Sequence, residues 1–122
     1  MPRVAFTLRL HAGMVDAYVA RHDPVWPEML AEIAAAGRRD YSLFLDRTRS
    51  EVFGYYETDD DEAARAYLAS SPVAARWEAS MSPFFVDLDG RADRVAPLIE
   101  IFNLHDQLAD LDAGTEHGST PS

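Results

Sequence analysis

The sequence predicts a single α+β domain in which a four-stranded antiparallel sheet carries its helices on one face. Two observations support this prediction. The chain of 122 residues is long enough for one hydrophobic core and too short for two. Stretches with the alternation of a β-strand are interspersed with stretches of helical spacing, in the order β-α-β-β-α-β. This order is that of the ferredoxin-like arrangement.

The first strand and the first helix follow from the spacing of apolar residues. Every second residue is apolar over positions 4–10, which predicts a strand with one buried face. Gly13 ends this pattern, and helical spacing follows over positions 15–22. Tyr18 and His22 are four residues apart, so they are expected one turn apart on one face of this helix.

The stretch 18–28 contains a tyrosine, a histidine, a tryptophan, two prolines and two carboxylates. Pro24 should end the first helix, because proline lacks an N–H group and disfavours a helical residue before it. Asp23 is then expected to cap a second helix, with Pro24 as its first residue and Gly37 as its C-terminal stop. His22 is therefore expected at a bend between two helical segments.

The remaining elements complete the predicted order. Strands are expected at 41–45 and 51–57, joined by a short polar hairpin. Gly54 inside the second of these indicates a bulge or a close approach by a ligand or another backbone. The acidic run 59–62 is typical of a helix start, and Ser71-Pro72 begins a further short helix. A loop over 84–97 and a last strand over 98–104 are expected to follow.

Two expectations concern the surface of the domain. Residues 1–105 are assigned to the α+β domain, and 106–122 to an acidic C-terminal tail that begins as a helical stub and is then mobile. Phe53 and Tyr55 share a parity in their strand, and Leu43 shares one with Tyr41 in the strand before it. We therefore expect the helix-free face of the sheet to form a pocket, a dimer interface, or both.

Composition excludes several classes of protein. The net charge of −10 argues against a nucleic-acid partner, because phosphate binding requires clustered Lys and Arg. The chain has no cysteine, which excludes disulfides and thiol nucleophiles. No apolar run approaches the ~20 residues of a membrane span, and no signal-peptide pattern opens the chain. We expect a cytoplasmic protein that binds neither nucleic acid nor membranes.

His22 is the best candidate for proton transfer. The chain has four histidines, His11, His22, His105 and His117, and none of their spacings is typical of a metal site. Phosphate-binding glycine loops and the GxSxG motif do not occur, so we expect neither a metal nor a cofactor. An ordinary pKa near ~6.5 suits histidine for acid–base work at neutral pH. The alternative is a structural histidine that binds a backbone carbonyl.

Three aromatic residues are candidates to line a pocket with His22. They are Tyr18, Tyr41 and Trp77, and each could equally be a core residue. Trp26 is interpreted as a core anchor. Considered alone, these residues outline an aromatic pocket with one histidine and do not name a reaction.

Together these residues resemble the L-rhamnose mutarotase family over nearly the whole domain. The most specific part is the spacing Tyr18…Arg21-His22 followed by Asp23-Pro24-Val25-Trp26-Pro27-Glu28. Further matches are Ala5-Phe6, Gly37, Tyr41, Leu45-Asp46, Arg49, Phe53, Glu57, Arg76-Trp77, Met81 and Glu100-Ile101-Phe102.

The resemblance implies a dimeric α+β barrel, that is, a homodimer of ferredoxin-like chains, whose active site interconverts the α and β anomers of a free monosaccharide. It also implies that His22 is the proton donor and that Tyr18, Tyr41 and Trp77 contact the sugar. The family's typical pattern has two consecutive tryptophans, whereas Glu78 follows Trp77 here. The expected substrate is therefore L-rhamnose or another deoxysugar such as L-fucose.

Mutarotation needs an acid, a base and room for the opened sugar to turn. We expect His22 to give a proton to the ring oxygen, while a carboxylate or water takes the other proton. Two other functions fit the same fold, because fold alone does not select a function. They are a cofactor-independent oxygenase of the dimeric α+β barrel type and a non-catalytic sugar-binding module. The motif around His22 favours the mutarotase over both.

Overall fold

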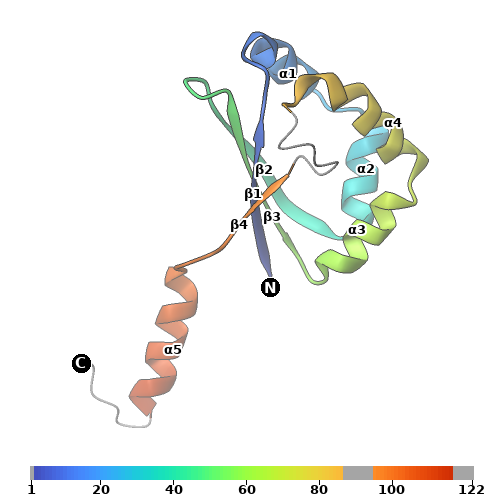
Figure 1. Ribbon diagram of the computed structural model, residues 1–122. Coiled ribbons are helices and arrows are strands. Elements are labelled where there is room, and N and C mark those ends of the chain that lie inside the picture. Colours follow the sequence, from blue (N-terminus) through green and yellow to red (C-terminus); the bar gives the residue numbers. More distant parts are fainter. Residues whose placement is uncertain (1, 87–94, 117–122) are drawn as a thin grey trace.

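The computed structural model describes residues 2–86 and 95–116, which form one sheet faced by a layer of helices (Figure 1). The helices α1 to α4 lie on one side of the sheet, and α5 extends away from both layers (Figure 1). The elements in chain order are β1 (Arg3–Arg9), a 3-10 turn (Ala12–Met14), α1 (Val15–Arg21), α2 (Pro27–Ala35), β2 (Arg38–Asp46), β3 (Glu51–Thr58), α3 (Asp61–Ala69), α4 (Pro72–Met81), a second 3-10 turn (Ser82–Phe84), β4 (Ala96–Leu98) and α5 (Leu104–Glu116).

The sheet has the strand order β2-β3-β1-β4, and every neighbouring pair is antiparallel. This is the order expected when two βαβ-type halves interleave in the ferredoxin-like arrangement. The predicted fold class is therefore confirmed. The main cluster of buried side chains lies where α1, β3 and α4 meet and contains Leu10, Val15, Tyr18, Val52, Met81 and Phe84.

A bulge in β2 decides which of its side chains face the helices. The pairing of β2 with β3 shifts register between Arg39 and Ser42, and Asp40 has a φ of 50°. Aspartate tolerates this left-handed conformation better than most residues. Because the bulge adds one residue to β2, Arg38 and Tyr41 face the same side of the sheet although they are three positions apart.

Gly54 makes room for an aromatic ring. It pairs with Phe6 on β1, and a Cβ atom added to Gly54 would lie 2.1 Å from the Cζ atom of that ring. The Phe6 ring can therefore lie across β3 toward Tyr41, with the two ring centroids 6.3 Å apart. The close approach expected at Gly54 is thus made by a side chain, not by a ligand or a second backbone.

The prediction for the start of the second helix was wrong by one turn. The helix α2 begins at Pro27, and the Asp23–Pro24 peptide is cis and precedes it. A helix starting at Pro24 would place Pro27 at its fourth position, where an N–H group is needed for the first intrahelical hydrogen bond. With Pro27 at the first position, no hydrogen bond is lost. His22 lies at the bend, as predicted, directly after α1.

The last strand was predicted at 98–104, but β4 spans Ala96–Leu98, so it begins inside the predicted loop 84–97 and shares only Leu98 with the predicted strand. In β4 Leu98 pairs with Ala5 and Pro97 with Phe6, so the antiparallel register brings the next residues to the end of β1. Residues beyond 100 have no further part of β1 to pair with, and Ile101 is 92% exposed. Most of the predicted loop, residues 87–94, lies outside the described residues.

The C-terminal helix α5 begins at Leu104, so the predicted boundary between domain and tail falls in its first turn. Arg3 on β1 holds this segment through ion pairs with Glu100 and Asp106. The division into domain and tail stays a prediction, and residues 117–122 lie outside the described part of the chain.

The helix-free face of the sheet carries exposed apolar side chains. Phe44 on β2 is 63% exposed, its partner Phe53 on β3 is 37% exposed, and Leu98 on β4 is 45% exposed. The dimer interface expected on this face stays a prediction. Tyr41 and Leu43 were also expected on this face, but they face the opposite side, where they line a cavity beneath the helices.

Candidate active site

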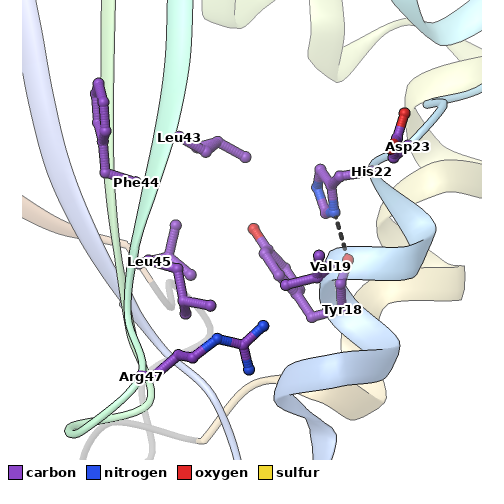
Figure 2. A pocket seen from close by; sticks show the side chains of 9 residues that line it. Tyr18, Val19, His22, Asp23, Leu43, Phe44, Leu45 and Arg47 are labelled. Atoms are coloured by element: carbon purple, nitrogen blue, oxygen red, sulfur yellow. Dashed lines mark hydrogen bonds between the residues drawn. The ribbon is translucent and has the colours of Figure 1, made fainter.

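A cavity of about 1270 Å³ lies between the sheet and the helix layer. All four residues proposed from the sequence, His22, Tyr18, Tyr41 and Trp77, are among its lining residues. They come from α1, the bend after it, β2 and α4, so only the fold brings them together. A smaller cavity of about 350 Å³ shares Tyr18 and His22 and is shown in Figure 2.

The imidazole of His22 has one nitrogen fixed and one nitrogen available. Its Nδ1 atom lies 2.8 Å from the backbone oxygen of Tyr18 (Figure 2). A carbonyl oxygen can only accept a hydrogen bond, so Nδ1 carries the hydrogen. In the neutral ring the proton-accepting atom is then Nε2. The ring points from α1 toward β2, into the same space as the Tyr18 hydroxyl (Figure 2).

The pKa of His22 is lowered from its ordinary value. Burial is the largest cause, because it disfavours the charged imidazolium, and the positive charge of Arg21 acts in the same direction. The hydrogen bond to the Tyr18 carbonyl opposes these effects only in part. His22 is therefore mainly neutral near pH 7.

Aromatic rings enclose His22 on two sides. The Tyr18 ring lies 4.3 Å from the imidazole between centroids, and the Trp77 ring lies 5.6 Å away at 86° to it. Trp77 is itself held edge-to-face against Trp26 at 5.0 Å. The guanidinium of Arg21 lies 5.4 Å from the Trp77 ring centroid and 5.8 Å from that of Trp26. These contacts fix the orientation of Trp77.

Two tyrosine hydroxyls line the cavity in their neutral form. Burial raises the pKa of Tyr18, and the neighbouring Tyr41 raises it further. Burial also raises the pKa of Tyr41, although the residue as a whole is 37% exposed. A neutral hydroxyl can both donate and accept a hydrogen bond, which matches the hydroxyl groups of a sugar.

Sequence reasoning missed three residues that line this cavity. Tyr56 follows Val52 and Gly54 at the spacing of one strand face, so its parity was a usable signal. Arg38 gave no such signal, because the bulge in β2 breaks the parity that connects it to Tyr41. Glu78, noted in the sequence only as a departure from a family pattern, also lines the cavity.

Two searches of the described residues concern metals and membranes. In the ranges 2–86 and 95–116, no three His, Asp or Glu side chains gather in a way that could hold a metal ion. The helices of that same part of the chain include none with the length and apolar character needed to cross a membrane.

Comparisons with known proteins agree on one family. The model of the L-rhamnose mutarotase family matches residues 3–104. An L-rhamnose mutarotase of Rhizobium meliloti (strain 1021) is 37% identical over 107 residues, which cover 85% of this chain and 99% of the relative. An L-rhamnose mutarotase of Bacillus subtilis (strain 168) is 35% identical over 104 residues, with the same coverage of both chains.

A solved structure agrees with these sequence matches. The crystal structure of an L-rhamnose mutarotase from Formosa agariphila has a TM-score of 0.72 to this chain at 27% identity, and the match covers 85% of this chain and 99% of that one. The family match ends at Leu104, where α5 begins. The chain therefore belongs to the L-rhamnose mutarotase family of isomerases.

Proposed function

We propose that this protein interconverts the α and β anomers of L-rhamnose, with His22 as the group that transfers the proton. The observation that carries the proposal is the position of His22. Its Nδ1 is held by the Tyr18 carbonyl, which leaves Nε2 as the proton-accepting atom of the neutral ring in a cavity lined by aromatic residues. An imidazole with one nitrogen held and the other able to accept a proton supports a role in acid–base catalysis on a bound sugar.

The sequence left the second proton to a carboxylate or water; because the lowered pKa of His22 favours its neutral form, we propose instead that this one imidazole both takes and gives the proton. Neutral Nε2 takes the proton of the anomeric hydroxyl as the carbonyl double bond forms at the anomeric carbon. The bond from that carbon to the ring oxygen breaks, its electrons stay on the oxygen, and the oxygen receives the proton from Nε2. Rotation of the aldehyde and the reverse steps close the ring on the other face. The imidazole ends as it began, and its lowered pKa favours this neutral starting state.

The aromatic residues are proposed to bind the sugar. Trp77 presents a ring held in place by Arg21 and Trp26, which suits contact with an apolar C–H face of a sugar. The hydroxyls of Tyr18 and Tyr41 are proposed to bond with sugar hydroxyls. Glu78 lines the same cavity, so a deoxysugar with a different hydroxyl pattern, such as L-fucose, is the alternative substrate.

Magnetisation-transfer NMR on a panel of L- and D-sugars at anomeric equilibrium tests this proposal. We expect the protein to accelerate anomer exchange of L-rhamnose above the spontaneous rate. Acceleration confined to L-fucose would correct the substrate. Binding of sugars without exchange would replace the enzyme by a sugar-binding module, and oxygen consumption with an aromatic substrate would favour the oxygenase.

We also propose that the chain forms a homodimer through the helix-free face of the sheet and works in the cytoplasm. The exposed Phe44, Phe53 and Leu98 are the apolar side chains that such an interface would bury. The absence of cysteine fits a reducing compartment. Light scattering coupled to gel filtration should give twice the chain mass, and Phe44→Asp should shift it to the monomer. A wild-type monomer at all concentrations would contradict the dimer.

A further inference from the structure

Arg38 is held at the cavity with hydrogen-bonding capacity unused. It is the first residue of β2, and its side chain is 14% exposed. The guanidinium carbon lies 4.3 Å from the centroid of the Tyr56 ring, and Nη2 lies 3.4 Å from Oδ1 of Asp61. Among residues 2–86 and 95–116, its Nε is the one buried side-chain nitrogen or oxygen that lacks a hydrogen-bond partner.

Asp61, the acidic partner of Arg38 within the described part of the chain, is shared with other donors. Asp61 accepts hydrogen bonds from the Tyr56 hydroxyl and, at 2.9 Å, from Nε of Arg65. Two arginines therefore share one carboxylate, and the contact made by Arg38 is the longer of the two. The Tyr56 ring and Asp61 fix the position of the Arg38 guanidinium without satisfying it.

The cavity connects this guanidinium to the catalytic histidine. Arg38, Tyr41 and His22 all line the cavity of about 1270 Å³, which is above the usual ~300–1,000 Å³ range of small-molecule sites. The Tyr41 ring lies 5.2 Å from Tyr56, which in turn lies beneath Arg38. The proposed binding mode has the anomeric carbon of the sugar at His22 and its other substituents directed toward Tyr41 and Arg38.

We infer that Arg38 is a sugar-binding and specificity-determining residue whose guanidinium, which lines the cavity, donates a hydrogen bond to a hydroxyl oxygen of the monosaccharide. The inference rests on the proposed function, in that the cavity is taken to bind a free sugar. Buried donors in proteins are nearly always paired, and a charged donor without an acceptor is costly. A sugar hydroxyl in the cavity gives this charged group a further acceptor, and an analogue without that hydroxyl loses the hydrogen bond and binds less well.

Arg38→Met tests this role, because methionine retains much of the apolar stem and removes every N–H donor. We expect the KM for L-rhamnose to rise about tenfold to hundredfold, as for loss of a hydrogen bond to a charged group. The kcat should stay within about threefold, because the proton transfer at His22 is untouched. The matched control is Arg39→Met. Arg39 is the next residue of β2, and its Nη2 donates to Asp59 at 3.0 Å. It does not line the cavity, so the KM of Arg39→Met should equal that of the wild type.

Monodeoxy analogues of L-rhamnose separate binding from an indirect effect on the fold. For the wild type, removing the hydroxyl that Arg38 contacts should raise KM by a similar factor. For Arg38→Met, removing that same hydroxyl should cost nothing further, while the other deoxy analogues stay additive with the substitution. A structural role would not produce this selectivity for one hydroxyl.

Two results would overturn the inference. One is an unchanged KM in Arg38→Met, and the other is an equal loss for every analogue accompanied by a lower melting temperature. If the wild type binds L-rhamnose without anomer exchange, the proposed reaction fails. In that case Arg38→Met and the wild type are compared by their Kd for L-rhamnose, measured by calorimetry with the full chain. There, a rise in Kd for Arg38→Met supports the role of Arg38, and an unchanged Kd contradicts it.

Discussion

The two ends of the cavity, at His22 and at Arg38, differ in how their surroundings act on an ionisable group. At the His22 end, a titratable ring lies among Tyr18 and Trp77, and the burial that they help to create lowers its pKa. At the Arg38 end, two arginines share Asp61, and hydrogen bonds and charges there overcome the effect of burial to lower the pKa of that carboxyl. The difference indicates a division of work. In the proposed mechanism, His22 moves the proton, while Arg38 keeps a constant charge and offers a hydrogen-bond donor.

Replacing His22 should give the largest effect on the rate of anomer exchange and leave the Arg38 end of the cavity unchanged. We expect His22→Ala to lower kcat for anomer exchange by about 10²–10⁴-fold, the usual contribution of general acid–base assistance. Sugar binding should persist, because Trp77, Tyr41 and Arg38 remain. Magnetisation transfer measures the rate, and calorimetry measures the Kd. His11→Ala is the matched control, because His11 is exposed and does not line the cavity.

The second largest effect should be that of pH, because the rate depends on the titration of His22 and sugar binding at Arg38 does not. The folded pKa of His22 lies below its ordinary value of 6.5, and neutral Nε2 is the form that accepts the anomeric proton. The rate should therefore be constant through neutral pH and fall as pH drops below that lowered pKa. The Kd for the sugar should change little over this range, because the arginines stay charged. A rate that rises as pH falls would identify the imidazolium as the starting form instead.

Removing the hydroxyl of Tyr41 should give the smallest effect on activity. We expect Tyr41→Phe to raise KM by about two- to tenfold, the equivalent of one ordinary hydrogen bond, with kcat nearly unchanged. Because the Tyr41 ring packs against Phe6 and Tyr56, phenylalanine should preserve that packing and the melting temperature. A loss of kcat as large as that of His22→Ala would mean that Tyr41 takes part in proton transfer, and the two ends would no longer be distinct.

Local patterns were sufficient for much of the fold. Period-two alternation and helical spacing gave the order of strands and helices, and that order has one common antiparallel solution. These patterns failed at two element boundaries, where residues outside the pattern decide where a strand or helix begins or ends. Residues beyond 100 cannot extend the last strand because its register carries them past the start of β1, and α2 starts at Pro27 because a proline cannot supply the first helical hydrogen bond.

The sequence by itself determined the fold class, the bend at His22 and the four residues suspected of lining a site. Helical spacing alone places Tyr18 and His22 on one face, whereas Tyr41 and Trp77 come from β2 and α4 and join them only in the folded chain. Only the tertiary structure decided that the cavity lies beneath the helices and that Arg38 belongs to it. The reason is the bulge at Asp40, which changes the face to which the start of β2 points. Whether a buried donor has a partner depends on every segment around it, and no local pattern contains that information.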